Sequence, residues 1–233
     1  MKAKRVLLLF LSAIIALFCL ASCSAEKEEP PELALLNRCA SYIEEYSSAT
    51  PADALELKKV ADDCKAVLDS DIFDRYYEQS LLKQNSVISG REDEYKESHL
   101  CEIMMLRLKC LLLSGETRDY NTEFLKYIKE IDSNTFTRQR FPEFFKNDSA
   151  LTLTKEQLEA AAGGYAAAAG SCSDEIEKYI LYNEEYSFIS FYSDDEAQKE
   201  KLYEQFNGIK EKMGNAAFEK HYNEWSGFDT DNK

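Results

Sequence analysis

The chain has 233 residues, enough for one or two domains. Its 43 acidic residues outnumber 28 basic ones, giving a formal net charge of −15, so we expect no nucleic-acid partner, because such partners need a basic face. Eight glycines and four prolines are too few for the many turns of a β-rich fold. The composition also excludes collagen-like, low-complexity and polytopic membrane classes.

The amino-terminal residues combine a positive start with a short apolar run. Lys2, Lys4 and Arg5 precede an apolar segment, residues 6–20, that only Ser12 interrupts. This run is shorter than the roughly 20 residues of a membrane-spanning helix. A charged start, a short apolar segment and small residues after it are typical of a secretory signal peptide.

The run closes with Leu20-Ala21-Ser22-Cys23. This tetrapeptide resembles the lipobox of bacterial lipoproteins, in which the cysteine is acylated on sulfur and the chain is cut just before it. The resemblance implies that residues 1–22 are a signal peptide and that Cys23 carries the lipid. It also implies a cell-membrane protein held by its lipid anchor, with its body outside the cytoplasm. One acyl chain gives only marginal membrane binding, so we expect several.

Two alternatives to lipidation stay open. The segment could be a secretory signal with a chance cysteine, or an uncleaved anchor helix. The anchor helix would still leave the body outside the cytoplasm, because positive residues precede it. Apart from the covalent lipid on Cys23, we expect no cofactor.

The segment after the lipobox is polar. Residues 23–31 end in Pro30-Pro31 and are predicted to form a short extended tether. We assign residues 32–228 to the folded body and residues 229–233 to a tail. Removal of the signal peptide takes away three basic residues and no acidic one, so the mature chain is more acidic still. This acidity favours solubility and cationic partners.

The body shows helical periodicity throughout and no convincing strand pattern. We predict an all-α fold without a sheet, either an antiparallel helical bundle or a loose stack of helix hairpins, with about eight helices. Neighbouring helices are expected to be antiparallel because the loops are short. Thr50 is expected to cap the second helix, with Pro51 at its first position. The apolar later half of the helix at 92–114 is expected at the centre of the core. The other expected helices span 32–48, 71–85, 117–131, 194–213 and 216–225, and two more begin near Thr154 and Ser173.

Residues 133–150 interrupt the helical pattern. They either join two lobes, 32–132 and 151–228, or form a loop within one domain. This segment holds a basic and aromatic cluster that is a candidate binding loop: Arg138, Arg140, Phe141, Phe144, Phe145 and Lys146. The alternative is a long loop whose phenylalanines are buried in the core while its cations stay solvated.

Five cysteines remain in the body, and Cys39 and Cys64 lie almost symmetrically about the Thr50-Pro51 turn. Positions equidistant from the turn of an antiparallel helix hairpin face each other, so a disulfide is available in an oxidising exterior. The alternative is a pair of small buried core residues. The sequence has no Cys-x-x-Cys or His-Glu-x-x-His spacing, so we expect no metal site.

The alanine- and glycine-rich run at 160–170 predicts a close helix crossing in the core; a hinge or a self-association face is the alternative. Catalytic motifs are missing: Ser80-Leu81-Leu82-Lys83 matches Ser-x-x-Lys but lacks that family's partner motifs. We therefore expect a non-catalytic binding, adaptor or assembly module for an envelope protein or a peptide. The alternatives are a glycan-binding surface protein, which would need exposed coplanar rings, and a hydrolase with a buried carboxylate pair.

Overall fold

The computed structural model describes residues 29–46, 53–84, 92–130 and 152–226, and every element in them is helical. The all-α prediction is therefore confirmed for the described residues. Their helices are α2 (Pro31–Tyr46), α3 (Ala54–Leu68), α4 (Ile72–Tyr76), the 3₁₀ turn η1 (Tyr77–Gln79), α5 (Leu81–Gln84), α6 (Glu92–Leu113), α7 (Thr117–Glu130), α9 (Lys155–Ser171), α10 (Glu175–Tyr192), α11 (Glu196–Met213) and α12 (Asn215–Ser226).

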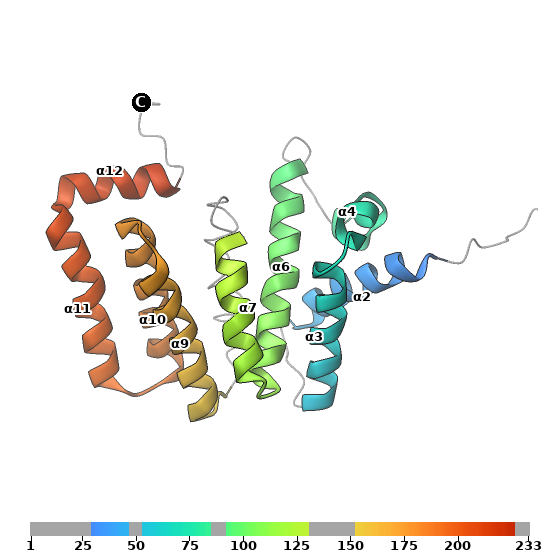
Figure 1. Ribbon diagram of the computed structural model, residues 1–233, viewed down its shortest axis with the longest axis horizontal. Coiled ribbons are helices and arrows are strands. Elements are labelled where there is room, and N and C mark those ends of the chain that lie inside the picture. The colour runs from blue at the N-terminus through green and yellow to red at the C-terminus, as the bar shows by residue number, and fades with distance from the viewer. Residues whose placement is uncertain (1–28, 47–52, 85–91, 131–151, 227–233) are drawn as a thin grey trace, which may run out of the picture.

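The long helices stand side by side in a row. Figure 1 shows the order α3, α6, α7, α9, α10, α11 across the molecule, with α2 and α12 lying crosswise at its two ends. The main contacts join α3 to α6, α6 to α7, α7 to α9, α9 to α10 and α10 to α11. Each helix thus packs chiefly on its neighbours in the row, which corresponds to the predicted stack of helix hairpins more than to a closed bundle.

The crosswise α2 and α12 (Figure 1) are not antiparallel to their chain neighbours, and within the row one neighbouring pair also departs from the expected antiparallel order. The Gln157 side-chain amide, in the first turn of α9, donates to the carbonyls of Leu112 and Leu113 at 3.0 and 3.1 Å. The amino end of α9 therefore lies at the end of the stack where α6 ends and α7 begins, and α7 and α9 run in the same direction (Figure 1). The reason is the long separation of these two helices in the sequence, because a short loop would have forced the chain to reverse.

Helices α3 and α9 begin where a side chain binds the free backbone amides of the first turn. Thr154 and Gln157 form a capping box at the start of α9, where the sequence predicts that a helix begins. The second helix begins at Ala54, not at Pro51, because the Asp53 carboxylate accepts hydrogen bonds from the Leu55 and Glu56 amides at 2.8 and 3.1 Å. An aspartate that binds two free amides is a strong amino-terminal cap.

The helix expected at 71–85 is broken into α4, η1 and α5. The break lies at Ser80, which is fully buried and adopts an extended backbone. Its hydroxyl donates to the Tyr77 carbonyl at 2.7 Å, and the Leu81 amide donates to the Asn37 side chain of α2 at 2.8 Å. These bonds replace the helical ones that the break removes, a local competition common for serine.

A single hydrophobic core extends from α2 to α11 and includes segments on both sides of residues 133–150. All residues from Ile103 to Leu112 of α6 are buried, so this helix has the central position that its apolar pattern predicted. At the α7–α9 crossing, a Cβ placed on Gly164 would lie 3.3 Å from Phe124 Cγ and 3.4 Å from Tyr120 Cε1. The run at 160–170 therefore forms the close crossing predicted from its small side chains. Among the described helices, none has the length and apolarity needed to span a membrane.

Candidate functional site

Seven aromatic side chains of α10, α11 and α12 form a continuous group that we call the aromatic band. Each ring lies within 6.5 Å, centroid to centroid, of at least one other. The members are Tyr179, Tyr186, Tyr203, Phe206, Phe218, Tyr222 and Trp225. The members come from three helices at one end of the row, where α12 crosses the ends of α10 and α11 (Figure 1).

The band has a buried floor. Phe206 of α11 and Phe218 of α12 are each 6% exposed, and both pack on Tyr179 of α10, at 5.6 and 4.7 Å. The Lys210 ammonium lies 5.3 Å from the centre of the Phe218 ring, a cation–π distance. Three helices thus fix these rings in place.

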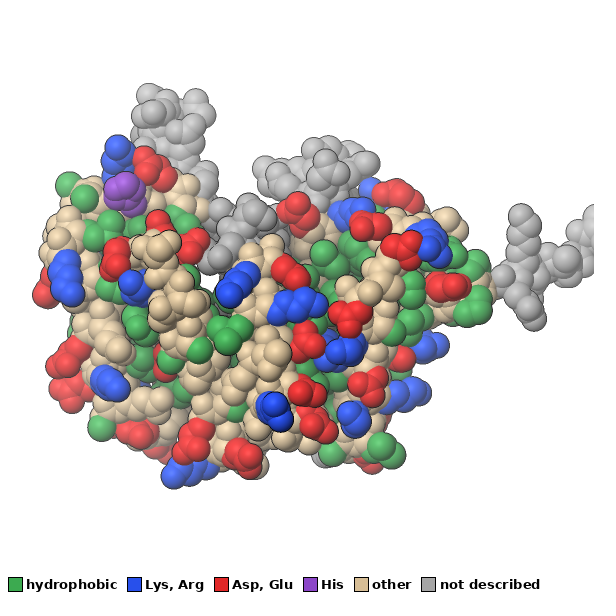
Figure 2. Space-filling view, in the orientation of Figure 1, with side chains coloured by type: hydrophobic (Ala, Val, Ile, Leu, Met, Phe, Trp, Pro, Cys, Tyr) green, Lys and Arg blue, Asp and Glu red, His purple; other side chains and the backbone are tan. Residues whose placement is uncertain are grey.

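The band also has an exposed rim. Tyr203 is 54% exposed and packs on Phe206 at 5.3 Å; Tyr222 is 37% exposed and stacks on Phe218 at 5.7 Å. Figure 2 shows hydrophobic side chains reaching the surface around α12 and the adjoining part of α11. Rigid aromatic rings that are half open to solvent, with a polar hydroxyl, are typical of protein-binding surfaces.

A tight turn creates this surface. Gly214 joins α11 to α12 with φ +77°, a backbone conformation that glycine adopts without strain. The Gly214 amide donates to the Lys210 carbonyl at 3.0 Å and closes α11. Because α12 starts directly after this turn, Phe218 and Tyr222 are brought across the end of α10.

The rings of the band meet mostly edge to face. The interplanar angles are 88° for Tyr179 with Phe206, 78° for Tyr203 with Phe206 and 70° for Tyr179 with Phe218. The stacked pair Phe218–Tyr222, at 21°, has a buried partner. The band therefore lacks the coplanar exposed rings that the glycan-binding alternative needs.

The sequence does not single out the band, because most of its rings lie at the helical spacing of core positions. Tyr179, Tyr186, Phe206 and Phe218 do have core-like helical spacing. What the spacing does not reveal is the turn at Gly214, which places the α12 rings against α10. A hydrophobic face on a final helix of 12 residues was the one available signal.

The predicted site residues divide into two groups. Cys23 and the whole basic and aromatic cluster at 138–146 lie outside the described residues. Cys39 and Cys64 are both described; they are free cysteines, 0% exposed, and lie beside each other at the contact of α2 with α3. The two thiols do meet, although α2 crosses α3 (Figure 1) instead of pairing along it as in the expected antiparallel hairpin.

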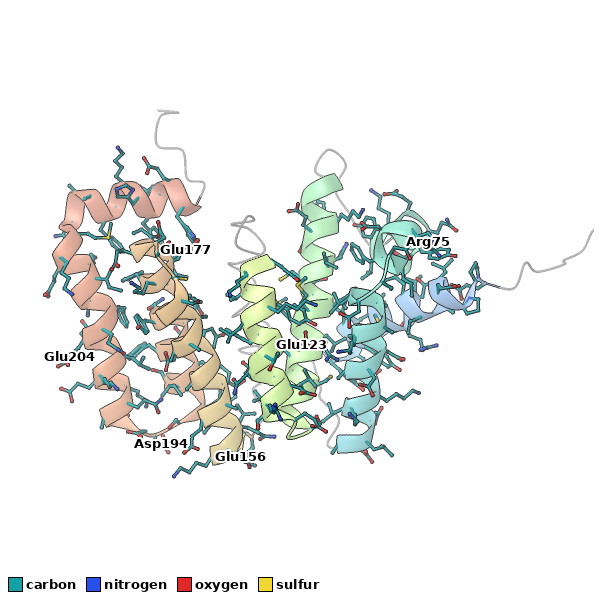
Figure 3. All side chains as sticks on the ribbon, viewed as in Figure 1. Arg75, Glu123, Glu156, Glu177, Asp194 and Glu204 are labelled. Carbon is teal, nitrogen blue, oxygen red and sulfur yellow. The ribbon has the colours of Figure 1, made fainter. Side chains whose placement is uncertain are left out.

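Buried charges also mark the centre of the stack. Arg107 of α6 donates to the Ala61 carbonyl and to Glu123 of α7, whose Oε1 lies 3.0 Å from Arg107 Nη2. Figure 3 labels Glu123 on α7. Glu185 of α10 is 4% exposed, and its Oε2 has no hydrogen-bond partner in the described part of the chain. The described residues contain no group of three or more His, Cys, Asp or Glu side chains that could hold a metal ion.

The comparisons with known proteins returned no matching family model, no similar curated protein and no similar solved structure. The functional argument therefore depends on the sequence patterns and on the geometry described above.

Proposed function

We propose that this protein is a bacterial lipoprotein that presents a non-catalytic helical binding module outside the cytoplasmic membrane. Cys23 carries the lipid, residues 24–30 separate the body from the bilayer, and the aromatic band docks a segment of an envelope protein or a peptide. The single observation that supports the docking role most strongly is the pairing of exposed Tyr203 and Tyr222 with the buried floor of Phe206 and Phe218.

The rigidity of these rings favours binding. Each rim tyrosine is already packed on a fixed ring, so little side-chain freedom is lost when a partner contacts it. The surroundings carry both signs of charge: Glu204 projects from the outer side of α11 (Figure 3), while Lys201 and Lys220 are also exposed. The band therefore favours an amphipathic segment over a uniformly charged one.

The docking role is tested with the double variant Tyr203→Ala/Tyr222→Ala in the full-length protein. The wild type and the double variant are each extracted from membranes. The amounts of other proteins that each one retains are then compared. The matched control is Leu55→Ala, which removes a side chain 78% exposed on α3, at the other end of the row.

We expect one partner to be retained by the wild type and the control and to be lost at least tenfold from the double variant. Purified partner and protein should reproduce the difference in a direct binding measurement, and all three proteins should show a cooperative thermal transition. The double variant should melt somewhat lower, because it loses two rings that pack on Phe206 and Phe218. Equal retention by all three would refute the docking role of the band.

The anchor is tested separately by Cys23→Ala. Acylation and cleavage at this position should be abolished, so the variant should keep residues 1–22 and take up no labelled fatty acid. An unchanged mass and unchanged labelling would contradict the lipobox interpretation.

A further inference from the structure

The contact between α2 and α3 brings two fully buried thiols together. Arg38, one residue before Cys39, donates to both carboxylate oxygens of Asp63, one residue before Cys64, at 3.2 and 3.4 Å. This ion pair, between side chains 50% and 18% exposed, joins the two helices one residue before each cysteine, and this register at the helix crossing brings positions 39 and 64 together. Both cysteines are 0% exposed, and the Cys39 and Cys64 side chains are within hydrogen-bonding contact.

From this register we infer that Cys39 and Cys64 form a disulfide in the mature protein, which fastens α2 to α3. The inference uses the proposed function in one respect, because the oxidising surroundings follow from the location outside the cytoplasm. α2 is the first helix after the tether, so every force between the lipid anchor and the body passes through it. A covalent link at Cys39 would keep this helix docked.

A third buried thiol, Cys110, lies near this pair and has to be distinguished from it. Cys110 of α6 is also 0% exposed, and burial raises its pKa to about 12. The Cys64 thiol is in hydrogen-bonding contact with Cys39, whereas the neighbouring Cys110 of α6 influences it only electrostatically. We therefore assign Cys110 as a thiol in the oxidised protein.

The oxidation transfers two electrons and two protons to a donor disulfide, either that of a thiol–disulfide oxidoreductase or a small oxidised thiol. One cysteine thiolate attacks a donor sulfur, forms a mixed disulfide and displaces the first donor thiol. The thiolate of the other cysteine then attacks the protein sulfur of this mixed disulfide and displaces the second donor thiol. The donor sulfur–sulfur bond breaks and the Cys39–Cys64 bond forms.

Burial determines when this reaction takes place. The attack needs an accessible thiolate, and burial raises the pKa of the Cys64 thiol well above its usual value. A donor disulfide therefore reaches these thiols before α2 docks on α3, and hardly afterwards. The redox state of the pair is set during folding and is then retained.

The test uses the full chain, unfolded and reduced, then refolded with oxidised and reduced glutathione, blocked with an alkylating agent and digested with trypsin without reduction. Cleavage after Arg38, Lys58, Lys59 and Lys65 separates the two cysteines into peptides 39–58 and 60–65. We expect these peptides to be joined, with a mass two hydrogens below their sum, in wild type and in Cys110→Ala. Protein alkylated at both Cys39 and Cys64 after this refolding would overturn the inference.

Two further measurements complete the test. Glutathione disulfide added to the folded reduced protein should form the bond at least tenfold more slowly than during refolding. The oxidised wild type should melt roughly 5–10 °C above Cys39→Ala/Cys64→Ala, because the bond closes the loop between these residues.

The same peptide map is made on protein alkylated in intact cells. Joined peptides there support the inference, and free thiols there count against a disulfide in the mature protein even if refolding forms one. The refolding result does not depend on the location of the protein, and the labelling of Cys23 shows whether free thiols in cells accompany a failure of the anchor or occur with the anchor intact.

Discussion

Arg107 of α6 and Glu123 of α7 form an ion pair inside the helix row, with 3.0 Å between Nη2 and Oε1 and side chains 4% and 13% exposed. Burial alone would raise the pKa of Glu123. Hydrogen bonds from Arg107 and Tyr127, together with the positive charges of Arg107 and Lys126, outweigh the effect of burial. The pKa of Glu123 therefore lies below its usual value. The pair thus joins the two central helices through a carboxylate that is ionised at neutral pH.

Removing the carboxylate should leave the Arg107 charge buried without its partner. We expect Glu123→Ala to lower the free energy of unfolding by roughly 2–4 kcal/mol at pH 7, since breaking one side of a buried pair is strongly destabilising. The control is Glu159→Ala, which breaks the exposed Lys155–Glu159 pair of α9. The control should change stability by less than about 0.5 kcal/mol in urea unfolding.

The effect of Glu123 should depend on pH in a defined direction. A carboxylate whose pKa is lowered by folding stabilises the folded state above its unfolded pKa, near 4.5, and loses that contribution as the pH falls through the lowered folded value. The difference between wild type and Glu123→Ala should therefore shrink as urea titrations move from pH 7 to pH 3. A constant difference over this range would contradict the ionic role.

Two adjacent glycines of α9 should respond in opposite ways to alanine. A Cβ on Gly163 meets nothing within 4 Å, so Gly163→Ala should stabilise the helix by up to about 1 kcal/mol. A Cβ on Gly164 meets Phe124 and Tyr120 at 3.3–3.4 Å, so these rings must shift. We expect Gly164→Ala to destabilise the protein by about 1 kcal/mol despite the same gain in helix propensity.

Thermal unfolding of the two glycine variants provides the measurement, and each variant is the control for the other. Equal stabilisation of both would mean that the α7–α9 crossing has room for a methyl group. The close approach assigned to the run at 160–170 would then be wrong.

Much of this fold could be predicted from local patterns, because helical spacing and capping residues act over a few positions. The centre of α6, the capping box at Thr154 and the facing of Cys39 and Cys64 are examples. The interruption at Ser80 was not predictable, because the bond from Leu81 to Asn37 joins residues 44 positions apart. The parallel course of α7 and α9 also depends on a distant contact, from Gln157 to the end of α6.

The candidate site was harder to predict for the same reason. The aromatic band brings together rings from three helices, and the turn at Gly214 sets their relative positions. A ring at core spacing on one helix can be buried, as Phe206 is, or half open, as Tyr222 is, and the periodicity is the same in both cases. Only the crossing of α12 over α10 distinguishes them.

Glu185 should make the stability of the protein depend on pH. This carboxyl is 4% exposed on α10, and burial raises its pKa to about 7 against the weaker opposing attraction of Lys201 from α11. The other described titratable group coupled to it is Tyr165 of α9, whose pKa also rises through burial. A raised folded pKa means that the protonated form is favoured on folding.

The direction in which stability changes with pH follows from the folded and unfolded pKa values of Glu185. Stability from protonated Glu185 is fully present below the unfolded pKa near 4.5 and is lost as the pH rises through about 7. Between pH 5 and pH 8 the wild type should lose roughly 2–3 kcal/mol from this group. Glu185→Gln, which is neutral at every pH, should remove most of this slope, and the exposed-site control Glu204→Gln should keep it. Urea unfolding at several pH values measures the slopes, and a wild-type slope retained in Glu185→Gln would show that another group titrates.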